Sequence, residues 1–193
     1  MKKLSLVAFI GLAAAISAVR GDIIPSFTGT SPSGPNTVWS YQIDITTNQQ
    51  VNIGDFFTIY DFGPFIAGSN TQPTGWSFSS SLVTTPPEGV TPPDDPTLEN
   101  LTWTYIGSTT IPTNSSVGPF SVTVAGSQVL STKQSYFAAK ATRDSGPQAG
   151  TKVNNVGRVS VPAPAPIPEP TTLSLLVLAG AGSAIRAIRK RAK

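Results

Sequence analysis

The residues able to do chemistry in this 193-residue chain are mostly carboxylates, because it has ten Asp and Glu residues but neither His nor Cys. Without imidazole or thiolate there is no ordinary ligand set for zinc, copper or haem, and no usual nucleophile–base pair. We expect no cofactor. Glu88, Asp94 and Asp95 lie close together in the sequence and could gather calcium, but the D-x-D-x-D-G spacing of a calcium loop is missing. A solvated acidic loop is favoured, with a calcium site as the alternative.

The triplet Asp144-Ser145-Gly146 matches the short core motif of aspartic proteases. Such catalysis needs two carboxylates that share a proton, and because the chain has one copy of the triplet, only a homodimer would supply the second. The same residues, followed by Pro147, are typical of a turn, which is the favoured interpretation. We predict that the chain is not an enzyme. The remote alternative is a carboxylate-dependent hydrolase, which would need two inward-facing acids about 5 to 10 Å apart in a cleft.

Three tryptophans suggest sugar binding, because aromatic faces stack on sugar rings. Trp39, Trp76 and Trp103, however, each share one side of a predicted strand with other large apolar residues, which is typical of core positions. We predict that all three lie in the core. Tyr60 and Phe65, near a long loop, are better candidates for exposed aromatic residues.

The elements that would position these residues are strands. Alternation of apolar and polar residues, with Gly, Pro, Asn and Ser between the runs, predicts half-buried antiparallel strands. The clearest runs are TVWSYQIDIT (37–46), NLTWTYIG (100–107), PFSVTVAG (119–126) and GWSFSSSLV (75–83), the last with Trp76, Phe78 and Leu82 on one face. DFFTIYDF (55–62) is apolar on both faces and predicts a more central strand, and weaker strands are expected at 135–142 and 156–161. The predicted fold is all-β, a single antiparallel β-sandwich (Ig-like or jelly-roll-like) of seven to nine strands from about Asn36 to Val161.

Proline and small polar residues mark the connections. Residues 62–75 form a long turn-rich loop, and residues 84–96 repeat Thr-Pro-Pro-acid twice, which predicts an extended polyproline-like loop. Residues 161–167 form a proline-rich stalk. With the next three residues, it would hold the domain roughly 30 Å from its attachment point. Asn100 and Asn114 open Asn-x-Ser/Thr sequences, which we interpret as chance matches.

Both ends of the chain have the composition of targeting segments. Residues 1–21 carry two lysines, an apolar run and small residues near Ala18 and Gly21, which predicts a cleaved secretory signal peptide, with an uncleaved helix as the alternative. Residues 173–185 lack charge and basic residues follow, so we predict a transmembrane helix at 173–188. Thirteen residues span only about 20 Å of a roughly 30 Å hydrocarbon core. An amphipathic helix packed on the domain is the alternative.

The residues around this apolar segment form a recognisable order. Pro168, Glu169 and Pro170 precede it, and the basic residues Arg186, Arg189, Lys190 and Arg191 follow it. This order resembles the PEP-CTERM sorting signal of exported bacterial proteins over residues 168–193, with Ile167 where valine is more usual and with apolar residues interrupting the basic cluster. The resemblance implies that a membrane-embedded processing enzyme, an exosortase, recognises the triplet and removes the helix. Glu169 would then be a recognition residue and not a catalyst.

The charge of the chain divides between its ends and its middle. From Asp22 to Glu169 there are five basic and ten acidic residues, a net charge of −5, so the +3 of the whole chain arises from the ends. We expect no nucleic-acid partner, since the basic excess belongs to targeting segments. Residues 22–160 suffice for one domain that packing alone must stabilise.

Together these features predict an exported protein with its ends in the cytoplasm and its domain across the inner membrane. It would be membrane-anchored before processing and then lie at the cell surface or in the extracellular matrix, with a structural or adhesive role in exopolysaccharide or biofilm. The exosortase is the expected partner and exopolysaccharide a candidate one. A carbohydrate-binding module is the alternative.

Overall fold

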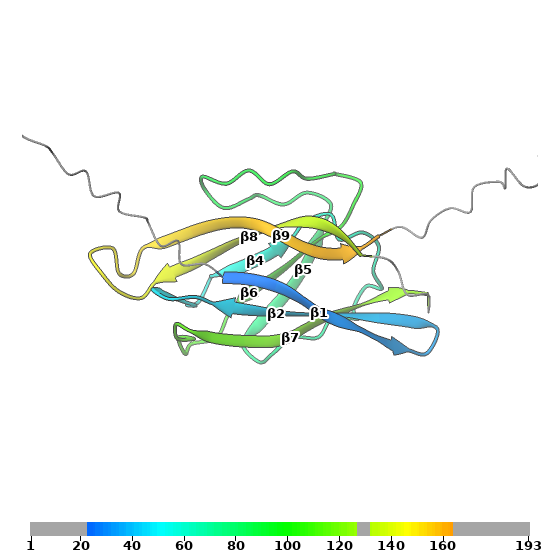
Figure 1. Cartoon of the computed structure of the whole chain (residues 1–193), viewed down its shortest axis with the longest axis horizontal. Helices are drawn as coiled ribbons and strands as arrows, with labels where there is room; N and C mark the ends of the chain where they lie inside the picture. The colour runs from blue at the N-terminus through cyan, green and yellow to red at the C-terminus, as the bar shows by residue number, and fades with distance from the viewer. Residues whose placement is uncertain (1–22, 127–131, 164–193) are drawn as a thin grey trace, which may run out of the picture.

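The computed structural model describes residues 23–126 and 132–163, and these residues form strands, turns and loops without a helix (Figure 1). The nine strands are β1 (Ile23–Ser33), β2 (Asn36–Ile45), β3 (Gln49–Gln50), β4 (Phe56–Ile59), β5 (Trp76–Ser81), β6 (Asn100–Tyr105), β7 (Ser115–Ala125), β8 (Thr132–Arg143) and β9 (Lys152–Pro162). The predicted signal peptide and transmembrane helix lie outside the described residues.

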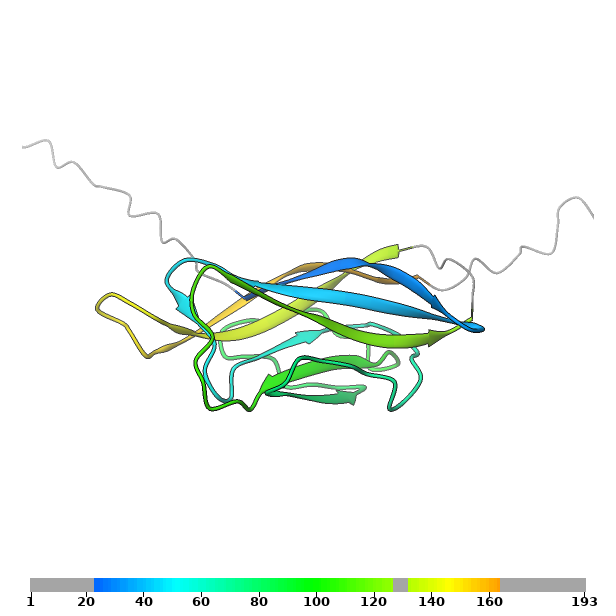
Figure 2. The ribbon, with the colours of Figure 1, turned by 90° about the horizontal axis from the view of Figure 1, so that it is seen from below.

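The strands pair into two antiparallel sheets. The smaller sheet has the order β1-β2-β7, and the larger has the order β5-β6-β4-β8-β9, with the short β3 paired to the end of β8. Figure 2 shows the smaller sheet as a separate layer over β4, β5 and β6. The predicted all-β antiparallel fold is confirmed, and the two layers are consistent with a β-sandwich.

The period-two pattern of the sequence determines which side chains lie between the layers. In β2 the residues Trp39, Tyr41, Ile43 and Ile45 are buried, whereas the residues between them are half-buried. β4 lies between β8 and β6, as its apolar character on both faces predicted. Its Phe57 ring stacks on Trp103 with centroids 5.1 Å apart, and Phe120 of the other sheet meets both rings edge-on.

Strand β1 was not expected from the sequence. Its segment IIPSFTGTSPS contains two prolines, a glycine and a bulge between Phe27 and Gly29, so it has no clear alternation. Proline is tolerated there because β1 is an edge strand that pairs with β2 alone among the described strands. Phe27 of β1 packs on Trp39 with ring centroids 4.9 Å apart, so this edge strand covers part of the core.

One predicted inward position was wrong. Leu82 follows the end of β5 at Ser81 and is 46% exposed, because the strand ends before its side chain could reach the interior. The two last strands, in contrast, are longer than expected, and the turn that joins β8 to β9 projects from one end of the molecule (yellow, left of Figures 1 and 2).

Candidate functional site

The sorting residues predicted from the sequence lie beyond the part of the chain that the structure describes. These are the triplet Pro168, Glu169 and Pro170, and the basic residues Arg186, Arg189, Lys190 and Arg191. Among residues 23–126 and 132–163, no helix is long and apolar enough to cross a membrane.

The three tryptophans are core residues, as predicted. Trp39 and Trp103 are completely buried and Trp76 is 4% exposed. Tyr60, predicted as a candidate for exposure, is also buried, because it continues the central strand β4 before the chain turns. Phe65 is half-buried and meets Phe78 edge-on at 5.8 Å. None of the three tryptophan rings is therefore available as a platform for a sugar.

The acidic residues that could have gathered calcium serve different local purposes. Asp94 accepts a hydrogen bond from the Asn100 side chain, and Asp95 accepts two from Thr97, which hold the pKa of Asp95 below its ordinary value. Glu88 lies elsewhere, with its main-chain carbonyl bonded to Asn154. In the described ranges, no three His, Cys, Asp or Glu side chains are grouped so that they could hold a metal ion.

The Asp144-Ser145-Gly146 triplet lies in the turn between β8 and β9. Ser145 donates a hydrogen bond to the Asp144 carboxylate, and Gly146 takes a positive φ of 79°. Asn100, the first residue of one glycosylation-like sequence, is fully buried, and its side chain ties the loop before β6 to the sheet. Its amide is inaccessible to modification in the folded domain.

The positive charge of the domain is concentrated on one hairpin. All five Lys and Arg residues of the described ranges lie on β8 or β9, whereas seven of the eight acidic residues of the same ranges lie on other strands and loops and the eighth, Asp144, lies in the β8–β9 turn. Because side chains alternate along a strand, Lys140, Lys152 and Arg158 lie on the outer face of the larger sheet, opposite to the core.

A groove is formed where this cationic face meets the loop of residues 82–99, here named the proline loop (green, top of Figure 1). The groove encloses about 410 Å³, and we name it the lysine groove. It is lined by Phe56, Thr85, Pro86, Pro87, Glu88, Lys140, Lys152 and Asn154. Pro87 of the loop is buried, as are Thr58 and Ala138 on the sheet face, which indicates that the loop packs on this face.

The floor of the groove continues as a row of side chains across the sheet. The strand register aligns Ser77 of β5, Thr104 of β6, Phe56 of β4, Lys140 of β8 and Asn154 of β9. Five strands about 4.8 Å apart make a row of about 19 Å. The ammonium of Lys140 lies 5.3 Å from the centre of the Phe56 ring, a cation–π contact that holds both side chains at the groove.

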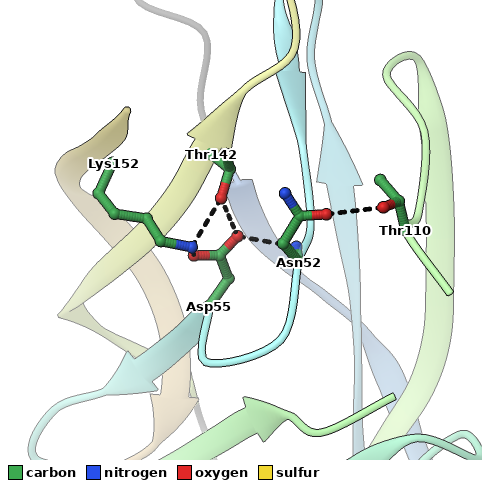
Figure 3. A network of polar contacts seen from close by, with 5 residues as sticks. All are labelled: Asn52, Asp55, Thr110, Thr142 and Lys152. Atoms are coloured by element: carbon green, nitrogen blue, oxygen red, sulfur yellow. Dashed lines mark hydrogen bonds and ion pairs between the residues drawn. The ribbon is translucent and has the colours of Figure 1, made fainter. Parts of the chain in front are cut away.

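The second lysine of the groove belongs to a polar network (Figure 3). Lys152 Nζ donates to Asp55 Oδ1 at 2.6 Å and to Thr142 Oγ1 at 2.7 Å, and Thr142 Oγ1 donates to Asp55 Oδ2 at 2.7 Å. Asp55 also accepts the main-chain N–H of Asn52 at 2.8 Å and is completely buried, whereas the Lys152 side chain is 41% exposed. The network fixes the lysine at its inner side and leaves its outer side facing the groove.

The arrangement can bind a negatively charged group, since the side chains of Lys140 and Lys152 both line one cavity. Sequence reasoning missed this site. Lys140 and Lys152 attract no attention as single residues, and the row that includes Ser77 and Phe56 depends on pairings across five strands that no spacing in the sequence reveals. Comparison of the chain with protein-family models, with curated proteins and with solved structures finds no match in any of the three.

Proposed function

We propose that this protein is an exported cell-surface or extracellular-matrix protein, sorted by its C-terminal PEP-CTERM-like signal, in which the β domain has a structural or adhesive role. The observation that carries the proposal is the order at residues 168–193: the triplet around Glu169, fifteen uncharged residues at 171–185, then four basic residues within six positions. The partners would be an exosortase and, before processing, the membrane.

The described domain supports this proposal. Its large aromatic side chains pack between two sheets, and with no cysteine in the chain it depends on that packing for stability outside the cell. We further propose that the two sheets form a sandwich of the immunoglobulin-like or jelly-roll-like kind, and that the domain acts by binding and not as an enzyme.

The experiment is an intact-mass measurement on the protein recovered from a bacterium that has an exosortase. We expect a mature protein that ends at or near Pro168–Pro170, and we expect Glu169→Ala to retain residues 173–193. Glu88→Ala, which changes an exposed glutamate of the proline loop, is the matched control and should be processed normally. A mature wild-type protein that keeps residues 173–193 would contradict the proposal and leave a plain membrane anchor.

A further inference from the structure

We propose that the lysine groove and the row that continues it form a binding site for an acidic polysaccharide chain. The inference rests on the proposed function, because a protein of the extracellular matrix is in contact with polysaccharide chains. To that function the inference adds the binding site and the class of ligand. The row's five side chains come one from each of β5, β6, β4, β8 and β9, five neighbouring strands of the larger sheet.

The charges favour an anion over a cation at the groove. Lys140 and Lys152 both line it, and the Lys152–Asp55 pair leaves the buried carboxylate fully occupied by Asn52, Thr142 and Lys152. A ligand therefore meets the outer side of an ammonium and not the carboxylate behind it. The other acid at the groove, Glu88, is exposed on the proline loop, so its side chain can point into solvent.

The remaining side chains favour a sugar chain over a small anion. The hydroxyl groups of Ser77 and Thr104 and the half-buried ring of Phe56 extend the site along a row of about 19 Å that ends at Asn154 of β9. Sugar recognition combines hydrogen bonds to hydroxyl groups with apolar contact to an aromatic side chain, and this row presents both. A volume of about 410 Å³ falls within the usual range of ligand pockets and accommodates a part of the chain.

The site is held in place by bonds that do not depend on the ligand. The Asn154 side chain donates to the carbonyl of Glu88 at 2.7 Å, so the proline loop is attached to β9 at the groove. At its other end the loop is attached through Asn100, which donates to Asp94 at 2.8 Å and accepts the N–H of Asp61. A fixed wall reduces the ordering cost of binding.

The test is calorimetric titration of the full chain, in a neutral detergent, with a hexamer of galacturonate, with a sulfated hexasaccharide and with a neutral galactose hexamer. We expect at least one of the two acidic sugars to bind and the neutral hexamer not to bind. Comparison of the two acidic sugars shows whether the site prefers carboxylate or sulfate. Lys140→Gln should weaken the binding at least tenfold. Lys133→Gln removes the same charge from the same strand at a position of opposite parity, and should change the affinity less than twofold.

Glu88→Gln provides a test with the opposite sign. If the ligand is an anion, removal of this carboxylate should tighten binding two- to fivefold. Equal losses in Lys140→Gln and Lys133→Gln would overturn the proposal, because they would show attraction to the hairpin charge in general. The proposal would also be overturned if Glu88→Gln bound the acidic sugars more weakly than the wild type. It would be overturned too if hexaglutamate, or galacturonate as a single sugar, bound as tightly as the acidic hexasaccharides. None of these results depends on processing at Glu169, so failure here is distinguishable from failure of the proposed function.

Discussion

At the scale of single residues, Tyr41 connects the two sheets through its hydroxyl group. Its ring is buried in the core, and the hydroxyl donates to the carbonyl of Ser160 on β9 at 2.9 Å. Burial raises the pKa of Tyr41 and, by the same cause, that of Tyr60, because the phenolate would have to be formed away from water. Both phenols therefore stay protonated to a higher pH in the folded domain than in the unfolded chain.

This predicts a loss of stability in alkali. A group with a raised pKa in the folded state contributes its full stability below its unfolded pKa of about 10, and loses it as the pH rises toward the folded value. We expect the free energy of unfolding in urea to fall above pH 10, and to fall less steeply in Tyr41→Phe. That variant should cost about 1 kcal/mol at pH 7 for the lost hydrogen bond. Identical slopes in both proteins would contradict the assignment, and absorbance of phenolate at 295 nm checks it directly.

At the scale of the elements, the Asp55 network joins three parts of the larger sheet. Asp55 precedes β4, Thr142 lies on β8 and Lys152 begins β9, 97 residues further along the chain. Asp55→Ala would remove the acceptor of three hydrogen bonds and leave the Lys152 ammonium beside a cavity. Since Lys152 is 41% exposed, solvent would compensate part of the loss.

We expect Asp55→Ala to destabilise the domain by about 2 to 3 kcal/mol, between the cost of one lost charged hydrogen bond and that of a broken buried ion pair. Asp55→Asn, which keeps an acceptor for Asn52, should cost less. The free energy of unfolding in urea measures both. Glu88→Ala is the control and should fall within about 0.5 kcal/mol of the wild type, as exposed substitutions usually do. A cost for Asp55→Ala no larger than this control would show that the network does not stabilise the sheet.

A strand can be predicted from the sequence when one of its faces is buried and the other is exposed to solvent. β2 and β6 alternate cleanly, and the buried positions of Trp39 and Trp103 follow from parity alone. β1 could not be predicted this way. Its position at a sheet edge tolerates proline and glycine, so its sequence does not alternate between apolar and polar residues. Tyr60 was misjudged because the chain stays buried past the end of β4. The lysine groove is inaccessible to sequence reasoning for a different reason, since it arises from the registers of four strand pairs and from a loop folded over them.

At the scale of the whole molecule, the two layers depend on long-range pairing. β1 is joined to β2 by a short turn, but it also contacts the far hairpin: the Asn155 side chain of β9 donates to the carbonyl of Ile23 at 3.1 Å. The other edge of the smaller sheet is covered, because the chain around Thr71 pairs with Ser121 of β7. The open edge at β1 carries Pro25 and Pro32, which lack the N–H that pairing with another chain would need.

The domain boundary is therefore a testable property of the whole fold. We expect residues 23–163, expressed alone, to be rich in β structure by circular dichroism, to unfold cooperatively and to show a blue-shifted tryptophan emission that acrylamide quenches poorly.

A version that begins at Asn36 lacks β1, so it loses the ladder along β2 and the Phe27 ring that covers Trp39. Because a domain of this size is stable by only about 5 to 15 kcal/mol, loss of an eleven-residue strand should abolish cooperative unfolding and make tryptophan quenchable. If the shorter version melts at the same temperature as residues 23–163 with equally protected tryptophans, β1 is dispensable to the core. Circular dichroism dominated by helix in either version would contradict the fold itself.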